Sequence, residues 1–124
     1  MKRTVTVIVA ILTLTACHHK QQPIYANEDK IDTIRSFCEN GALKSVECKL
    51  HNRLNGVCLY YYCNGNISGK YTYRNGIKDG PFETFYSNGT LRSQGILAND
   101  SIVSMDYWII NDKGKLLEHR KLPK

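Results

Sequence analysis

The 124-residue sequence has no apolar run long enough to cross a membrane as a helix. The stretch from Val5 to Leu14 has about ten residues, whereas a helix that spans the hydrocarbon core needs about twenty. The sequence also lacks a glycine-rich phosphate loop, because its glycines fall at predicted turns. It lacks the C-x-x-C pairs of structural zinc sites as well. These absences argue against a permanent transmembrane helix, a nucleotide-binding loop and a zinc centre.

The sequence also shows no group of residues of the kind that forms a catalytic site. His18 and His19 lie beside Cys17, His51 falls in a predicted turn, and His119 lies near the carboxyl terminus. The acidic residues are scattered, as on a solvated face. We therefore expect no enzyme, no cofactor and no metal centre, and the histidines leave only adventitious metal binding as an alternative.

The amino terminus has the order of an export signal. Lys2 and Arg3 precede the apolar stretch, which ends at a small-residue cleavage site. The segment Leu14-Thr15-Ala16-Cys17 resembles the lipobox of bacterial lipoproteins, in which the signal is removed and the cysteine carries the lipid. The resemblance implies that Cys17 is acylated (palmitate is one such chain) and that its acyl chains hold the protein to a membrane. By resemblance to enterobacterial lipoproteins, His18 after the cysteine favours sorting of the protein to the outer membrane, where it would face the periplasm.

The predicted mature chain is long enough for one small domain. Loss of Lys2 and Arg3 leaves 15 basic residues against 11 acidic ones, so the net charge falls from +6 to +4. The basic residues are scattered except near the carboxyl terminus, which argues against nucleic-acid binding. We expect a signal peptide at 1–16, a lipidated linker at 17–30, a repeat domain at 31–120 and a tail at 121–124.

The cysteines other than Cys17 are even in number, which predicts two disulfides in an oxidising compartment. They are Cys38, Cys48, Cys58 and Cys63. Cys48 and Cys58 are expected to face each other across a turn, so their bond is the first choice. Cys38 and Cys63 remain as the second pair, which requires a bend or bulge in the first repeat.

A repeat occupies residues 33–117. Asn-Gly recurs at Asn40, Asn64 and Asn88, a spacing of 24 residues, and Asn55-Gly56 is followed 24 residues later by Asp79-Gly80. These dipeptides supply the positive φ of tight hairpin turns and flank segments rich in β-formers. We therefore predict an all-β protein, an elongated single-layer antiparallel meander of stacked β-hairpins.

The 24-residue spacing also assigns equivalent positions. One position holds Phe37, Tyr61, Phe85 and Ile109, and another holds Ile34, Cys58, Phe82 and Asp106. The last copy, Met105 to Ile110, departs from the pattern. A helix is an alternative to a strand only between Asn27 and Cys38, where the sequence has helical features. Alignment with the later repeats favours a strand from Thr33 onward.

The pattern resembles the MORN-repeat variant family. The match is strongest in Asn75 to Phe82, which reads Asn-Gly-Ile-Lys-Asp-Gly-Pro-Phe, and in Phe85 to Gly95, which joins a double aromatic to an Asn-Gly turn. The resemblance implies stacked hairpins. Because some members look like antitoxins or immunity proteins, it also implies a toxin or effector as the partner.

Aromatic residues in the predicted strands supply the candidate binding surface. It consists of Tyr60, Tyr61, Tyr62, Tyr71, Tyr73 and Tyr86. Tyr107 and Trp108 belong to the same set of strand aromatics. Because side chains alternate between faces, three consecutive tyrosines cannot all be buried. Tyrosine is common at interfaces, although it also suits strands that bind nothing.

These features predict a membrane-anchored envelope lipoprotein that binds another protein. The alternative is a binder of peptidoglycan or of lipid headgroups such as those of lipopolysaccharide, with tyrosines stacked on sugars and the basic carboxyl terminus on phosphates. A hydrolase is a third hypothesis.

Overall fold

The computed structural model describes residues 30–123 of the chain. Within this range the chain forms nine β-strands that belong to one antiparallel sheet, and it forms no helix. The predicted all-β antiparallel class is therefore confirmed. The predicted signal peptide and Cys17 lie outside the described residues. Residues 30–123 also contain no helix long and apolar enough to cross a membrane.

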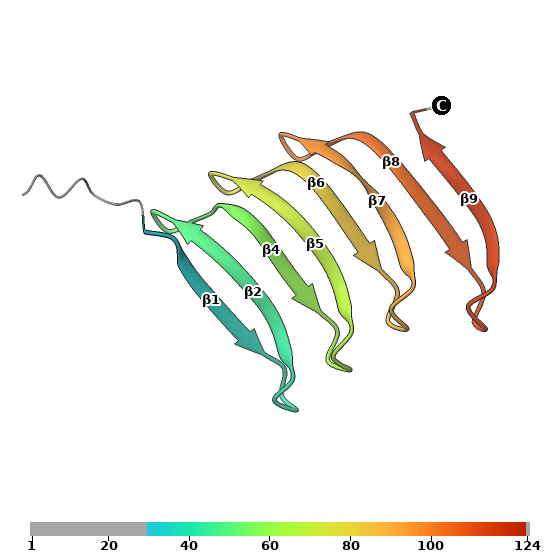
Figure 1. The fold of residues 1–124 in the computed structure, drawn as a ribbon, viewed down its shortest axis with the longest axis horizontal. Coiled ribbons are helices and arrows are strands. Elements are labelled where there is room, and N and C mark those ends of the chain that lie inside the picture. Colours follow the sequence, from blue (N-terminus) through green and yellow to red (C-terminus); the bar gives the residue numbers. More distant parts are fainter. Residues whose placement is uncertain (1–29, 124) are drawn as a thin grey trace, which may run out of the picture.

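The strands follow one another across the sheet almost in chain order (Figure 1). Their bounds are β1 (Asp32–Phe37), β2 (Leu43–Leu50), β3 (Arg53–Leu54), β4 (Gly56–Tyr61), β5 (Ile67–Arg74), β6 (Ile77–Phe85), β7 (Leu91–Ala98), β8 (Ser101–Ile110) and β9 (Leu116–Leu122). The order in the sheet is β1-β2-β4-β5-β6-β7-β8-β9, and the short β3 pairs with the end of β2. The competing helix is absent from the described part of the region, because β1 begins at Asp32.

Asparagine and glycine build the turns that close the hairpins. In the turn after β1, the Asn40 side chain accepts a hydrogen bond from the backbone N–H of Ala42 at 3.1 Å, and Gly41 has a φ of 81°. The turns after β4 and β6 repeat this bond at Asn64 and Asn88, with distances of 3.0 Å and 2.9 Å. A short side chain that satisfies the backbone two residues ahead is what makes asparagine a turn former.

The hairpin of β8 and β9 has a different register from the one predicted. Phe85 pairs with Leu91 in the preceding hairpin, and here Ile110 rather than Ile109 pairs with Leu116. The predicted equivalence of Ile109 and Phe85 is therefore wrong. The physical reason is local, because the turn glycine Gly114 lies one residue later than a step of 24 residues from Gly89 would place it.

The shifted register also changes the predicted role of Asp106. Phe82 pairs with Gly95, and Gly95 pairs in turn with Met105, so Met105 shares the face of Phe82. Asp106 lies opposite Gln94 on the other face. A shift of one residue moves a side chain to the opposite face of a strand, so the equivalence of Asp106 with Phe82 is wrong.

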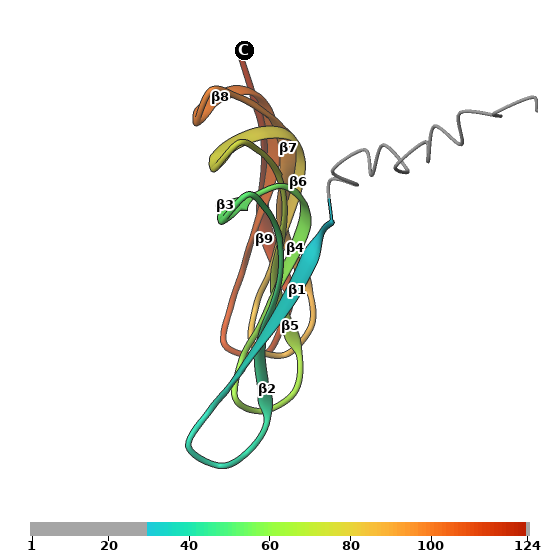
Figure 2. The ribbon, with the colours of Figure 1, turned by 90° about the vertical axis from the view of Figure 1, so that its left-hand side faces the viewer.

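The sheet encloses little core. Among the apolar side chains of residues 30–123, only Cys58, Phe82 and Leu97 are buried, and the buried Ser45 and Ser93 lie on the same face. Seen from its side, the sheet is a narrow, bent layer (Figure 2). Eleven large apolar side chains in this range stay exposed.

Candidate recognition surface

A row of aromatic rings crosses three strands on the more buried face. Tyr60 of β4 meets Tyr71 of β5 edge to face, with ring centroids 6.0 Å apart. Tyr71 in turn lies parallel to Phe82 of β6 at 6.1 Å. The Lys78 ammonium lies 4.2 Å from the centroid of Tyr71, a cation–π contact. Cross-strand pairing places these rings side by side, because Tyr71 pairs with Phe82, and Tyr60 pairs with Gly69, two residues before Tyr71 on the same face.

Burial raises the pKa of two tyrosine hydroxyls in this row. The Tyr60 hydroxyl lies 3.4 Å from that of Tyr73. Burial raises the pKa of Tyr60 well above its ordinary value, and the hydrogen bond with Tyr73 adds to the effect. Burial also raises the pKa of Tyr71. Both hydroxyls therefore keep their protons to a higher pH than an ordinary tyrosine does.

Two other tyrosines join the hairpin of β4 and β5 to that of β6 and β7, and the latter to that of β8 and β9. The Tyr62 hydroxyl donates to the carbonyl oxygen of Phe85 at 2.8 Å, and the Tyr86 hydroxyl donates to that of Trp108 at 2.9 Å. The Arg92 guanidinium lies 5.6 Å from the centroid of the Tyr86 ring. These bonds fix the rings in place, so their exposed faces form a preorganised surface.

A hollow of about 730 Å³ lies among these aromatic residues. Its aromatic rings are those of Tyr62, Tyr71, Phe82, Tyr86 and Tyr107. Phe85 and Trp108 also line it, but their positions in the strands face the other side, where the Trp108 ring stacks on His119. Lys78 and Arg92 contribute positive charge, and Asp100 contributes one carboxylate. Both the size and the mostly apolar lining suit a binding site. We call this surface the aromatic hollow.

The structure divides the six predicted binding residues into two groups. Tyr62, Tyr71 and Tyr86 line the aromatic hollow, whereas Tyr60, Tyr61 and Tyr73 do not. All six are half-buried. The prediction missed Phe82, Arg92 and Tyr107 as site residues. The aromatic content of the strands was a usable signal for Tyr107, but only the order of strands in the sheet brings β8 next to β7.

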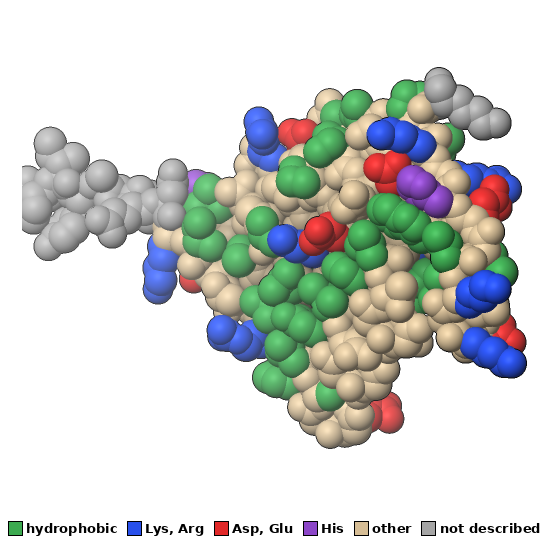
Figure 3. Space-filling view, turned by 45° about the vertical axis from the view of Figure 1, so that its right-hand side comes forward, with side chains coloured by type: hydrophobic (Ala, Val, Ile, Leu, Met, Phe, Trp, Pro, Cys, Tyr) green, Lys and Arg blue, Asp and Glu red, His purple; other side chains and the backbone are tan. Residues whose placement is uncertain are grey.

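The opposite face carries a row of polar residues across five strands. Lys70, Glu83, Gln94, Asp106 and Lys121 are successive cross-strand partners. Lys70 and Glu83 approach to 3.7 Å, and the His119 imidazole lies 3.5 Å from the Asp106 carboxylate. This row forms part of the lining of a groove of about 690 Å³, to which Val57, Pro81 and Ile96 add apolar surface. Figure 3 shows patches of hydrophobic side chains on one face of the molecule. Among them lie a basic side chain next to an acidic one and a histidine next to another acidic side chain.

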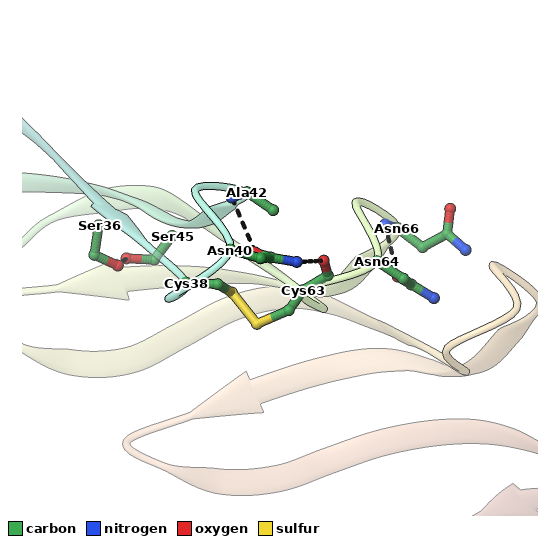
Figure 4. The surroundings of a disulfide bond; sticks show 8 residues. All are labelled: Ser36, Cys38, Asn40, Ala42, Ser45, Cys63, Asn64 and Asn66. Atoms are coloured by element: carbon green, nitrogen blue, oxygen red, sulfur yellow. Dashed lines mark hydrogen bonds between the residues drawn. A yellow bond between two sulfur atoms is a disulfide. The ribbon is translucent and has the colours of Figure 1, made fainter.

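A disulfide joins the first two hairpin turns. Cys38 follows β1 and Cys63 follows β4, and their Cα atoms are 5.9 Å apart. The Asn40 side chain lies beside the bond and donates to the carbonyl oxygen of Cys63 at 2.9 Å (Figure 4). Successive turns lie side by side at the same end of the strands. Residues that follow two strands that are not neighbours can therefore form a disulfide. The pairing predicted second, Cys38 with Cys63, is therefore confirmed.

The pairing predicted first, Cys48 with Cys58, is wrong. Ser45 pairs with Tyr60, so Cys58 shares their face, whereas Cys48 lies on the other face of β2. A disulfide requires the two Cβ atoms to face each other. Both residues are free thiols. Burial raises the pKa of the Cys58 thiol, which makes it poorly reactive.

Residues 30–123 contain no group of three histidine, cysteine or acidic side chains that could hold a metal ion. Searches against models of known protein families, against curated proteins and against solved structures found no match to this chain. The surfaces of the sheet are therefore the basis for a functional conclusion.

Proposed function

We propose that this protein is a lipid-anchored envelope protein that binds another protein and catalyses no reaction. In this proposal the export signal places Cys17 at the membrane, and the sheet is an array of hairpin repeats with a 24-residue period, related to the MORN-repeat variants. A toxin or effector delivered to the envelope is the partner that this resemblance suggests.

The observation that carries the proposal is the aromatic hollow. Tyr62 and Tyr86 are locked by hydroxyl bonds to the next hairpin, so their rings lose little entropy on binding. Lys78 and Arg92 hold positive charge at the same surface. Fixed aromatic rings with nearby cations are typical of protein-binding hot spots. The net positive charge favours a partner with an acidic contact surface.

A matched pair of substitutions tests whether the hollow binds the partner. Ile102 lines the aromatic hollow and is 54% exposed, while Ile96 lines the groove on the opposite face and is 42% exposed. Ile102→Asp should abolish capture of the partner from envelope extracts, because it places a carboxylate in an apolar contact. Ile96→Asp carries the same chemical change and should leave capture intact. Equal capture by both variants would refute the hollow as the binding surface.

The membrane anchor has its own test. Cells that produce the protein are labelled with palmitate, and the label should enter the wild type but not the Cys17→Ser variant. The wild type should also fractionate with the outer membrane. A wild-type protein without label would disprove the lipid anchor while leaving the test of the hollow untouched.

The second candidate function is binding of an envelope glycan or lipid headgroup. Cations stacked against tyrosine rings, Lys78 on Tyr71 and Arg92 on Tyr86, favour it because sugars stack on such rings and phosphates pair with such cations. Pull-down with purified peptidoglycan or lipopolysaccharide separates the two functions. Retention of wild type and loss of Ile102→Asp in this assay, with no protein captured, would favour the glycan.

A further inference from the structure

Strand β9 is an open edge of the sheet. It pairs only with β8, at the end of the strand order and far from the amino-terminal edge (Figure 1). In an antiparallel pair, every second residue directs its N–H and C=O groups away from the partner strand. These groups on β9 are therefore free to pair with another strand. Such an edge is a template for strand addition.

The sequence of β9 is complementary to itself. If two copies of β9 run antiparallel with the two-fold axis at His119, then Glu118 lies opposite Arg120 of the second copy. Leu117 lies opposite the alkyl stem of Lys121. Opposite charges and apolar pairs directly across two strands stabilise their pairing. The axis generates each of these contacts twice.

The charges that this pairing needs are already on one side of the strand. Glu118 and Arg120 form two hydrogen bonds within one chain, so both side chains project from the same face of β9. Leu117 is 63% exposed. The pairing would cover this apolar surface. The bulge of β9 falls at Leu117 and leaves the central positions 118–120 regular.

We propose that the protein forms a two-fold symmetric dimer through β9, which joins two nine-stranded sheets into one continuous sheet. The occupant of the edge is a second copy of this chain. Pairing of β9 with β1 of another copy would not close and would produce a fibre rather than a dimer. The dimer leaves the aromatic hollow open, so this proposal stands apart from the partner proposed above.

Charge reversal at the axis tests the dimer. The full chain, purified in detergent, is examined by analytical ultracentrifugation over a range of concentrations. Glu118→Arg should raise the dimer Kd about ten-fold or more, because like charges then oppose each other twice. Arg120→Glu should do the same. The double variant Glu118→Arg/Arg120→Glu restores both ion pairs and should recover the wild-type Kd.

A cysteine at the axis gives a second measurement. His119→Cys places two thiols opposite each other, and mild oxidation should link the copies. Leu117→Cys opposes Lys121 rather than itself and should not link. Circular dichroism confirms that each variant keeps its strand content. A monomeric wild type, or a dimer that charge reversal leaves unchanged, would overturn the proposal.

Discussion

Gly95 reveals how closely β7 approaches β8. A Cβ atom on this residue would lie 2.0 Å from the carbonyl oxygen of Ser104 and 2.9 Å from the Cα of Met105. Both are backbone atoms, so relief requires the two strands to separate. At Gly69, the nearest atom to such a Cβ is Cε2 of the Tyr71 ring, 2.9 Å away, which a side-chain rotation can relieve.

The two glycines therefore predict different costs for the same substitution. Gly95→Ala should lower the free energy of unfolding by about 3 kcal/mol, as expected for overpacking against backbone. Gly69→Ala should lower it by about 1 kcal/mol or less. Urea denaturation of the two variants beside the wild type measures the difference. Equal losses would contradict the close approach of β7 and β8.

Tyr60 predicts an alkaline limit to stability. Its pKa in the folded protein is raised by burial and by the bond with Tyr73, whereas a tyrosine in the unfolded chain ionises near pH 10, about its ordinary value. Above that pH the unfolded chain releases a proton that the folded protein retains. The contribution of Tyr60 is therefore complete below about pH 10 and declines as the pH rises further.

Urea denaturation at about pH 8 and about pH 11 checks this sign. The wild type should lose more free energy of unfolding between the two than Tyr60→Phe, which has no ionisable group at this position. Tyr61→Phe changes the opposite face of the same strand and should keep the wild-type loss. A Tyr60→Phe variant with the full wild-type loss would show that Tyr60 is not the responsible group.

The hairpin of β1 and β2 shares fewer paired residues with the next hairpin than the other hairpins share with theirs. β2 and β4 share two residue pairs, whereas β4 and β5 share six. Two further connections join these hairpins at the turn. They are the disulfide between Cys38 and Cys63 and the hydrogen bond from the Asn40 side chain to the Cys63 carbonyl oxygen. At the opposite end of the strands, two backbone hydrogen bonds also connect successive hairpins. The N–H of Gly76 donates to the carbonyl oxygen of Leu54, and the N–H of Asp100 donates to that of Lys78.

Removal of the disulfide should therefore release the first hairpin. We expect Cys38→Ser to lower the free energy of unfolding by about 3 kcal/mol, because the bond closes a loop across 25 residues of sequence. Hydrogen exchange should show that β1 and β2 lose protection while β5 to β7 keep it. Cys48→Ser removes a free thiol and should cost about 1 kcal/mol or less. Uniform loss of protection across the sheet would contradict a local role.

At the scale of the whole molecule, the sheet is built almost in one dimension. Each strand pairs with its neighbours in the order, and no second layer of described residues covers either face. Interior strands have two neighbours, and those of the middle carry the buried Phe82 and Leu97. Stability in such an array depends on neighbour contacts and is lowest at the ends.

Hydrogen exchange of the wild type should follow this order. Protection is expected to be highest in β6 and β7 and lowest in β1 and β9. Raising the protein concentration should increase protection of β9 if the proposed dimer forms, while β1 should stay unchanged. Equal protection of all strands would show that the sheet unfolds as a single unit.

The amino-acid sequence by itself determined the antiparallel sheet and the sites of its turns. Those features depend on local chemistry, since Asn-Gly at Asn40, Asn64 and Asn88 sets a positive φ wherever it occurs. Only the tertiary structure decided which cysteines bond, which tyrosines line the aromatic hollow and which face Asp106 occupies. These outcomes depend on register between strands, where one residue of shift exchanges the two faces and leaves the local turn signals unchanged.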